Sequence, residues 1–329
     1  MSDKKARNSS IDALKGIAII AVILLHLPAS RTTDSVGWQL LNILGRFAVP
    51  CFFLISGYFF RLSWERTENK PQLLAKSILR IIPIFLFWAA VYAILPPFVD
   101  GGDWSSHLQA ILHYPHSFIL TGNVYHLWFL SSLLQGLLVL WVFLWLDHYR
   151  YGLVFGALLY TVALVAGTYS MTPLGFPISF DMKNGPFFST LFVFLGALLA
   201  QGKCLLGKTA AITMALCGFI LCIAEVSFLH ARYGQPFRGL SVTVGTIPFA
   251  LGIMNLALLG LCPSKWLAFI GRYSLGVYVI HPWFIELFKA LGLGGLSTIP
   301  VLFLALVLAL SLLLTWSLAK VSYIKRLVI

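Results

Sequence analysis

The first apolar segment of the chain carries three ionisable side chains at helical spacing: Asp12, Lys15 and His26. Lys15 and His26 are eleven residues apart, so in an α-helix they lie on one face, separated by about 16 Å along the axis. Asp12 precedes Lys15 by three residues, where its carboxylate can pair with the ammonium group. Ionisable groups are costly in apolar segments and indicate function. Because histidine titrates near neutral pH, His26 is predicted to act as a general base.

Two further charged residues lie within apolar runs of the sequence. Arg46 is about eight residues into the run 38–60, and we expect it to face the interior and bind a carboxylate, a carbonyl or a phosphate. A buried positive charge of this kind can also stabilise an oxyanion. Glu225 lies near the end of the run 209–229. Three interpretations of Glu225 stay open: it orients His26, it binds a substrate hydroxyl, or it pairs with Arg46.

Four segments, in order along the chain, resemble the acyltransferase-3 family of membrane proteins. The first is a basic residue followed by ten positions and then a histidine, here Lys15 and His26. The others are residues 50–58, with the pattern Pro-x-Phe-Phe-x-x-Ser-Gly-Tyr, residues 126–130, which read His-Leu-Trp-Phe-Leu, and residues 274–282, which end in His-Pro. Two departures are Lys15, where most members have arginine, and Lys76-x-x-x-Arg80, where many have Arg-x-x-Arg. The resemblance extends from about residue 11 to residue 320.

The resemblance implies a membrane-bound O-acyltransferase. Such an enzyme would transfer an acyl group, in the simplest case acetyl, from cytoplasmic acetyl-coenzyme A to a hydroxyl of a surface glycan, an exported glycan or a lipid-linked sugar. His26 is the expected base, or the carrier of the acyl group in a relay between the two membrane faces. On this basis we expect catalytic roles for His26, Lys15, Asp12, Arg46 and Glu225, phosphate contacts from Lys15, Lys76 and Arg80, and acceptor contacts from His126, Trp128, Ser274, Tyr278 and His281. No metal is expected, since the five cysteines lack the spacing of a metal site.

Other interpretations of these residues and of the chain stay open. Lys15, Lys76 and Arg80 also suit anchors at the cytoplasmic ends of spans, and Trp128 suits an aromatic belt. His281 also suits a structural role in which a neighbouring helix satisfies its ring. A transporter or flippase for a glycan or a lipid-linked intermediate is the main alternative function, because intramembrane charges mark transport paths too. Internal symmetry would favour transport, and the sequence has none that is visible. A third alternative is a non-catalytic membrane module.

The elements that must position these residues are transmembrane helices. The sequence is 59% hydrophobic and 10% charged, unlike a soluble domain, and apolar runs of roughly 17 to 25 residues recur along it. Only helices and closed barrels satisfy the backbone in lipid, and these runs are too long for strands. We therefore predict an all-α polytopic integral membrane protein, a single domain of residues 1–329, with about ten spans: 11–29, 38–60, 78–97, 124–146, 151–168, 187–201, 209–229, 241–261, 273–291 and 298–319.

The distribution of charge predicts the orientation of the bundle. Of the 23 lysines and arginines, 16 fall in segments on one side of the predicted spans and five on the other. The positive-inside rule puts the richer side in the cytoplasm, with both termini and a short tail of residues 1–10. This rule also accounts for the net charge of +12 without nucleic acid as a partner. We expect a bacterial inner-membrane protein that contacts lipids and its glycan acceptor, and homo-oligomerisation stays open.

Overall fold

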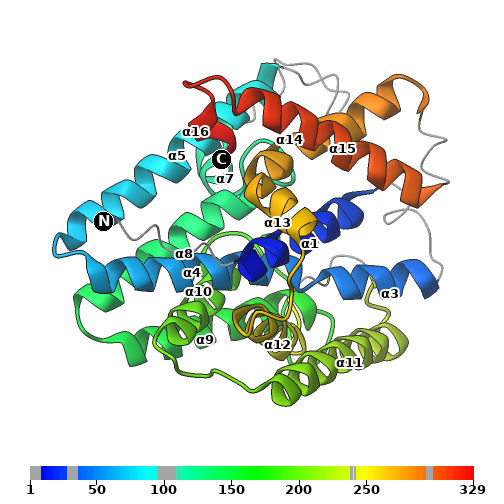
Figure 1. Cartoon of the computed structure of the whole chain (residues 1–329). Helices are drawn as coiled ribbons and strands as arrows, with labels where there is room; N and C mark the ends of the chain where they lie inside the picture. The colour runs from blue at the N-terminus through cyan, green and yellow to red at the C-terminus, as the bar shows by residue number, and fades with distance from the viewer. Residues whose placement is uncertain are drawn as a thin grey trace.

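The apolar runs of the sequence form α-helices. The computed structural model describes residues 9–27, 36–94, 109, 112–237, 240, 242–293 and 299–329. Within these residues the chain has no strand (Figure 1). The helical elements are α1 (Ser9–His26), α3 (Val36–Gly45), α4 (Ala48–Arg66), α5 (Lys70–Ile94), α7 (Pro115–Thr121), α8 (Trp128–Trp145), α9 (Tyr149–Ala163), the π-helical turn η2 (Leu164–Thr168), α10 (Pro186–Ala200), α11 (Lys208–Tyr233), α12 (Thr246–Leu258), α13 (Lys265–Arg272), α14 (Ser274–Ala290), α15 (Pro300–Leu318) and α16 (Lys325–Val328).

The all-α membrane fold predicted from the sequence is confirmed, whereas the number of spans is not. Each of the ten predicted ranges contains a helix. In the described part of the chain, seven helical segments are long and apolar enough to cross a membrane, and α10 and α12 are shorter apolar helices. The seven begin at Ser9, Val36, Lys70, Trp128, Tyr149, Lys208 and Pro300. Residues 1–8 of the predicted N-terminal tail lie outside the described residues.

The second predicted span is broken at Arg46. Helix α3 ends at Gly45 and α4 begins at Ala48, so Arg46 and Phe47 form a turn between two helices. Pro50 explains the break, because its ring would clash with the carbonyl of Arg46 in a continuous helix and its nitrogen has no hydrogen to donate. In the first turn of α4 the same proline is tolerated. Irregular backbone at membrane depth is tolerated where it is buried in protein or lines a cavity.

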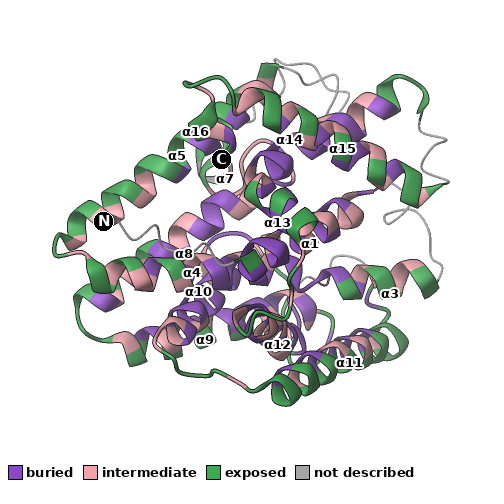
Figure 2. Ribbon diagram, in the orientation of Figure 1, coloured by how far each residue is buried: buried purple, intermediate pink, exposed green. Residues whose placement is uncertain are grey.

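Two close helix contacts fix the interior of the bundle. A Cβ atom at Gly57 of α4 would lie 2.0 Å from the carbonyl oxygen of Val193 in α10, so only glycine allows this approach. Helix α1 packs as closely on α13, where a Cβ at Gly16 would lie 2.1 Å from the carbonyl oxygen of Leu267. Helices α1, α4 and α10 therefore form the interior, and α5, α11 and α15 expose much of their surface at the periphery (Figure 2).

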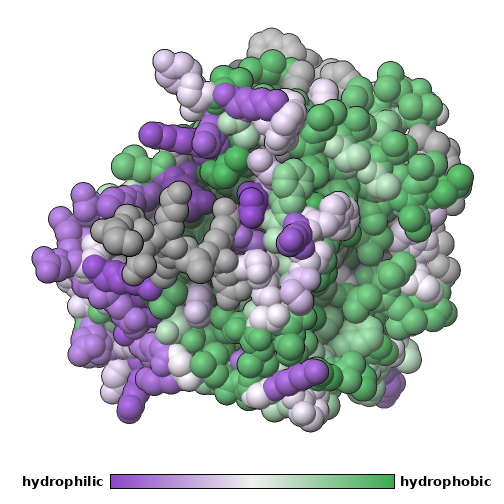
Figure 3. All heavy atoms as spheres, in the orientation of Figure 1, coloured by the Kyte–Doolittle hydropathy of each residue, from purple (hydrophilic) through white to green (hydrophobic). Residues whose placement is uncertain are grey.

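The exposed surface is largely apolar, as a lipid environment requires. Many large aliphatic and aromatic side chains on α5, α11 and α15 face outward. In the face shown in Figure 3, polar residues gather at the left, near the turn between α4 and α5, while apolar residues cover most of the remainder. On this face most polar groups lie toward one side, and the apolar remainder is suited to contact with lipid.

Candidate active site

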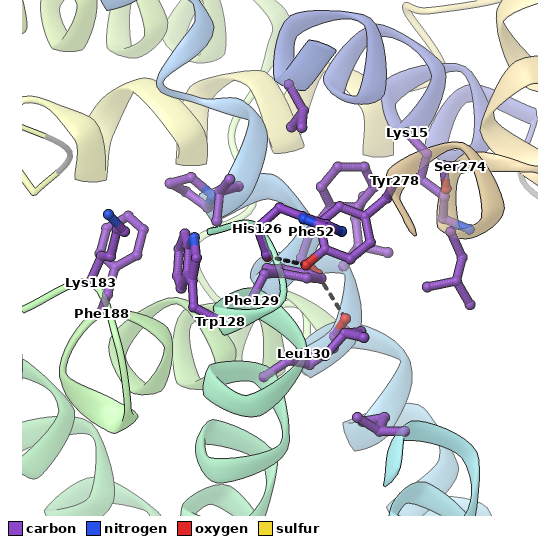
Figure 4. Close-up of a pocket in the computed structure, with 18 of the residues that line it drawn as sticks. Lys15, Phe52, His126, Trp128, Phe129, Leu130, Lys183, Phe188, Ser274 and Tyr278 are labelled. Atoms are coloured by element: carbon purple, nitrogen blue, oxygen red, sulfur yellow. Dashed lines mark hydrogen bonds between the residues drawn. The ribbon is translucent and has the colours of Figure 1, made fainter. Parts of the chain in front are cut away.

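A cavity of about 640 Å³ lies between α1, α4, α5, α8 and α14. Lys15 and His26 both line it, together with Val22, so positions i, i+7 and i+11 of α1 share its wall. This is the common face that the eleven-residue spacing predicts. Figure 4 shows Lys15 and Ser274 on one side of the cavity, Lys183 and Trp128 on the other, and His126 and Tyr278 between them. The cavity therefore extends along the helices and has two distinct ends.

The first end carries three basic side chains: Lys15, Arg80 and Arg272. The Lys15 ammonium lies 3.1 Å from a carboxylate oxygen of Asp12, which confirms the pairing predicted from their spacing. Helix α13 brings Arg272 beside this turn of α1, because Gly271 packs directly on the backbone carbonyl of Asp12. Several cations at one mouth can bind a group with more than one phosphate.

Helix α5 brings Arg80, but not Lys76, to the cavity. Helix α5 leads away from the turn after α4 (Figure 1), and its Ala89 carbonyl accepts a hydrogen bond from Asn123, close to Tyr125 and His126 in sequence. Arg80 precedes Ala89 by nine residues, so it lies about 13 Å nearer the turn between α4 and α5. The ammonium of Lys15 lies 5.8 Å from the ring centre of Phe59, on the half of α4 that leads to this turn. Arg80 and Lys15 are therefore assigned to the same end of the cavity. Lys76, also predicted to bind phosphate, is exposed and is not among the residues that line the cavity.

His26 and His281 form a pair beside the cavity. His281 Nδ1 lies 2.8 Å from the carbonyl oxygen of Tyr278 and 3.1 Å from that of Val277. Since a carbonyl only accepts, this nitrogen carries the proton, and Nε2 of a neutral His281 is an acceptor. Nε2 lies 3.3 Å from Nδ1 of His26, which also lies 2.8 Å from the carbonyl oxygen of Val22. Nδ1 of His26 therefore carries its proton, and the lone pair of the neutral ring is on Nε2.

Aromatic and imidazole rings surround this pair. The ring centre of Tyr125 lies 5.2 Å from that of His26, and the ring centre of His126 lies 5.9 Å from that of His281. His126 is 1% exposed, it lines the cavity, and neither of its ring nitrogens has a hydrogen-bond partner. Tyr278 fixes the backbone at this point by donating its hydroxyl hydrogen to the carbonyl oxygen of His126. Buried imidazole nitrogens without partners are suited to a polar ligand.

The second end of the cavity carries Lys183 and Trp128 (Figure 4), and Arg46 lines the cavity on the His26 side, since Gly45 packs against the Leu25 side chain. One terminal nitrogen of Arg46, Nη2, donates to the carbonyl oxygen of Phe237 at 3.0 Å and to Asn42 Oδ1 at 3.3 Å. The ammonium of Lys183 lies 5.9 Å from the ring centre of Trp128, close enough for a cation–π contact. This end combines a flat indole ring with fixed positive charge.

Glu225 does not line the cavity. Its carboxylate accepts hydrogen bonds from the Tyr169 hydroxyl at 2.8 Å and from the backbone N–H groups of Val244 and Gly245 at 3.1 and 3.2 Å. These bonds hold the turn that precedes α12. They account for the buried carboxylate without His26, and no ion pair between Glu225 and Arg46 is present among the described residues.

Most of the residues predicted from the sequence share the cavity, and some that were not predicted join them. The lining includes Lys15, His26, Arg46, Arg80, His126, Trp128, Ser274 and Tyr278. Asp12 and His281 contact lining residues from behind. Tyr125, Lys183 and Arg272 also line it. Tyr125 and Arg272 lie next to recognisable motifs, but nothing in the local sequence of Lys183 distinguishes it from a loop lysine.

Metal binding is not suggested by the side chains of the site. In the ranges that the structure describes, no group of three or more histidine, cysteine or acidic residues is placed to hold a metal ion. The groups that converge on the cavity are instead an imidazole pair, an unpartnered imidazole and several cations. This set is suited to transfer of a proton beside anionic ligands.

Comparison with known proteins decides the family. A family model described as an acyltransferase domain matches residues 8–320. The chain belongs to the acyltransferase-3 family. This confirms the resemblance found in the four sequence segments, and the chain is a membrane-embedded acyltransferase domain.

The acyltransferase is also similar to parts of larger curated proteins. It is 26% identical over 293 residues to an amino-acid racemase of Enterococcus faecalis and 26% identical over 295 residues to a serine/alanine racemase of Enterococcus gallinarum. Each match covers 84% of this chain and 41% of the relative. The chain thus spans about two-fifths of the length of these relatives, and their names describe the whole proteins. No solved structure matches the chain.

Proposed function

We propose that this acyltransferase transfers an acyl group, in the simplest case acetyl, from acetyl-coenzyme A to a hydroxyl of a surface or exported glycan. The observation that carries the proposal is the position of His26 on the wall of a cavity that has cations at one end and an indole ring at the other. The phosphates of coenzyme A suit the end with Lys15, Arg80 and Arg272, and a sugar ring suits Trp128.

The chemistry centres on Nε2 of His26. This nitrogen takes the proton of the acceptor hydroxyl while the oxygen attacks the carbonyl carbon of the thioester. The tetrahedral intermediate then collapses, the carbon–sulfur bond breaks, and the departing thiolate of coenzyme A receives the proton from His26. In a relay, the same lone pair of Nε2 would attack the thioester carbonyl and expel the thiolate of coenzyme A. The acceptor oxygen would then attack the acyl group, the bond to Nε2 would break, and the freed Nε2 would take the hydroxyl proton and pass it on to the thiolate or to solvent. Label on a His26 peptide after incubation with radioactive acetyl-coenzyme A alone would identify the relay.

The membrane orientation in this proposal follows from the charge distribution. The end with Lys15, Arg80 and Arg272 faces the cytoplasm, where acetyl-coenzyme A is available, since the segments on that side hold most of the lysines and arginines. The end with Lys183 and Trp128 then faces outward, toward an exported glycan. In bacteria this membrane is the inner membrane.

A matched pair of histidine variants tests the proposal. Purified protein is incubated with acetyl-coenzyme A and envelope glycan, and acetylated product is measured by mass spectrometry. His26→Ala is expected to reduce transfer by about 10² or more, the usual contribution of a general base. His113→Ala is the control, because His113 is exposed and outside the cavity. A folded His26→Ala protein with normal transfer would refute the mechanism.

The same cavity also favours one alternative, the transport of an anionic glycan intermediate, because cations line both of its ends. Thermal stability separates the two functions. The enzyme is expected to be stabilised by acetyl-coenzyme A in detergent. A transporter would show no such stabilisation. Deletion of a transporter would remove the glycan from the surface, whereas deletion of the enzyme would remove only the acetyl groups from the glycan.

A further inference from the structure

The charged side chains that line the cavity are all basic. Five lysine and arginine side chains line it, and among the described lining residues there is no aspartate or glutamate. Three of the five lie at the donor end, where the coenzyme A phosphates of the proposed function explain them. The other two are Arg46, on the His26 side, and Lys183, at the acceptor end. Lys183 is paired with Asp181, so Arg46 is the cation that a neutral sugar acceptor would leave without an anionic partner.

Arg46 is the more informative of these two cations. Its side chain is 7% exposed, and the atom Nη1 is buried without a hydrogen-bond partner. The other terminal nitrogen, Nη2, is occupied by Asn42 and by the carbonyl of Phe237. A buried guanidinium with an unused donor is costly unless a ligand completes it. Because Arg46 lines the cavity, the ligand that completes it can come from the cavity.

No described carboxylate forms an ion pair or a hydrogen bond with Arg46, although Glu225 lies close enough to interact with its charge. Glu225 is the acidic residue predicted as a partner, but its carboxylate is bound by Tyr169 and two backbone N–H groups. Lys183 differs from Arg46 because it pairs with the exposed carboxylate of Asp181. The turn at residues 46–47, which Pro50 enforces, holds the Arg46 backbone at the cavity wall instead of within a regular helix.

We infer that the acceptor is an acidic glycan, and that Arg46 binds its carboxylate or phosphate group while His26 acts on a hydroxyl of the same acceptor. This inference rests on the proposed function and names its substrate class. Arg46 lies beside the His26 end of α1, since Gly45 packs within contact distance of the Leu25 side chain. A carboxylate and a phosphate present the same charged oxygens to a guanidinium, and the two sources can be distinguished chemically.

The experiment compares one acidic envelope glycan in three forms: untreated, with its carboxylates reduced to alcohols, and with its phosphates removed. Wild-type protein is expected to lose about tenfold or more in kcat/KM when the recognised group is removed, the contribution of one hydrogen bond to a charged group. A loss after carboxyl reduction identifies a carboxylate as the group that Arg46 binds, and a loss after dephosphorylation identifies a phosphate. Equal kcat/KM for all three forms would overturn the inference.

Variants then assign the effect to Arg46. Arg46→Met is expected to raise KM for the untreated glycan about tenfold and to abolish the difference between treated and untreated forms, and Arg46→Lys should retain part of that difference. Arg232→Met is the matched control, because Arg232 is exposed at the end of α11. An equal fall in kcat for every form would instead assign Arg46 to the oxyanion and overturn the inference.

Two outcomes separate this inference from the proposed function. Thermal stabilisation of Arg46→Met by coenzyme A verifies that this variant is folded. If Arg46→Met does not fold, the inference is still tested by the three glycan forms with the wild-type protein and with Arg46→Lys. Transfer by wild-type protein to none of the glycan forms would refute the acyltransfer proposal itself. Transfer with no preference for the acidic forms would refute only the role of Arg46.

Discussion

His281 is predicted to be a positioning residue, and its replacement offers a sharp test of the site geometry. The ring is fully buried behind His26 and does not line the cavity. It contacts the reacting group through its ring, whose centre lies 5.2 Å from that of His26, and through the 3.3 Å approach of Nε2 to His26 Nδ1. His281→Leu removes this acceptor, and His281→Gln retains an oxygen that can accept the same hydrogen bond.

The size of the effect follows from the two acceptors that share the His26 N–H. The carbonyl of Val22, 2.8 Å from His26 Nδ1, belongs to the same helix and is not altered by the substitution, so we expect His26 to lose the longer of two bonds and to keep its tautomer. One neutral hydrogen bond contributes about 0.5–1.5 kcal/mol, which corresponds to a decrease in rate of roughly two- to tenfold. We therefore expect His281→Leu to lower kcat by this factor with the KM for acetyl-coenzyme A unchanged.

The assay measures initial rates of acetyl transfer from radioactive acetyl-coenzyme A to glycan, with the thermal midpoint of each variant as the control for folding. His281→Gln should return kcat toward the wild-type rate, which a merely space-filling role would not produce. Wild-type kcat in a folded His281→Leu protein would refute the positioning role. A loss of about 10³ or more would also refute it, because that loss is typical of a group that transfers the proton itself.

Two further predictions follow from packing and charge. Gly57→Ala is expected to destabilise the protein by about 1–3 kcal/mol in thermal denaturation, because the added Cβ would lie 2.0 Å from the carbonyl oxygen of Val193. Gly37→Ala is the control: no atom lies within 4 Å of its added Cβ, so stability should change little. Arg80→Gln is expected to raise the KM for acetyl-coenzyme A by up to about fivefold, with a smaller effect at high salt. Lys76→Gln should leave this KM unchanged. Equal effects of the two substitutions would contradict the finding that the cavity reaches Arg80 but not Lys76.

The features that the sequence predicts correctly are those set by local geometry. An apolar run of about 20 residues must be helical in lipid, and this holds for the helices of the bundle. The pairing of Asp12 with Lys15, and the common face of Lys15 and His26, follow from the 3.6-residue period of one helix. The family also follows from sequence, since its motifs are short and ordered along the chain.

Other features depend on contacts between segments far apart in the chain, which local periodicity does not specify. The sequence predicts Lys76 and Arg80 on similar faces of one helix, but only packing decides that the cavity reaches Arg80. Packing likewise directs Glu225 to the turn before α12, and His281 to the back of His26 rather than to the cavity wall.

Helix α4 shows both kinds of information in one segment. The sequence by itself determines the break before α4, through Pro50, and it contains the Ser-Gly motif at Gly57. Only the tertiary structure decides that Gly57 meets the backbone of α10 and that the turn before Pro50 holds Arg46 at the cavity wall. The physical reason is that a buried charge or a missing side chain acquires its role from the atoms that surround it, and those atoms belong to segments more than 100 residues away in the chain.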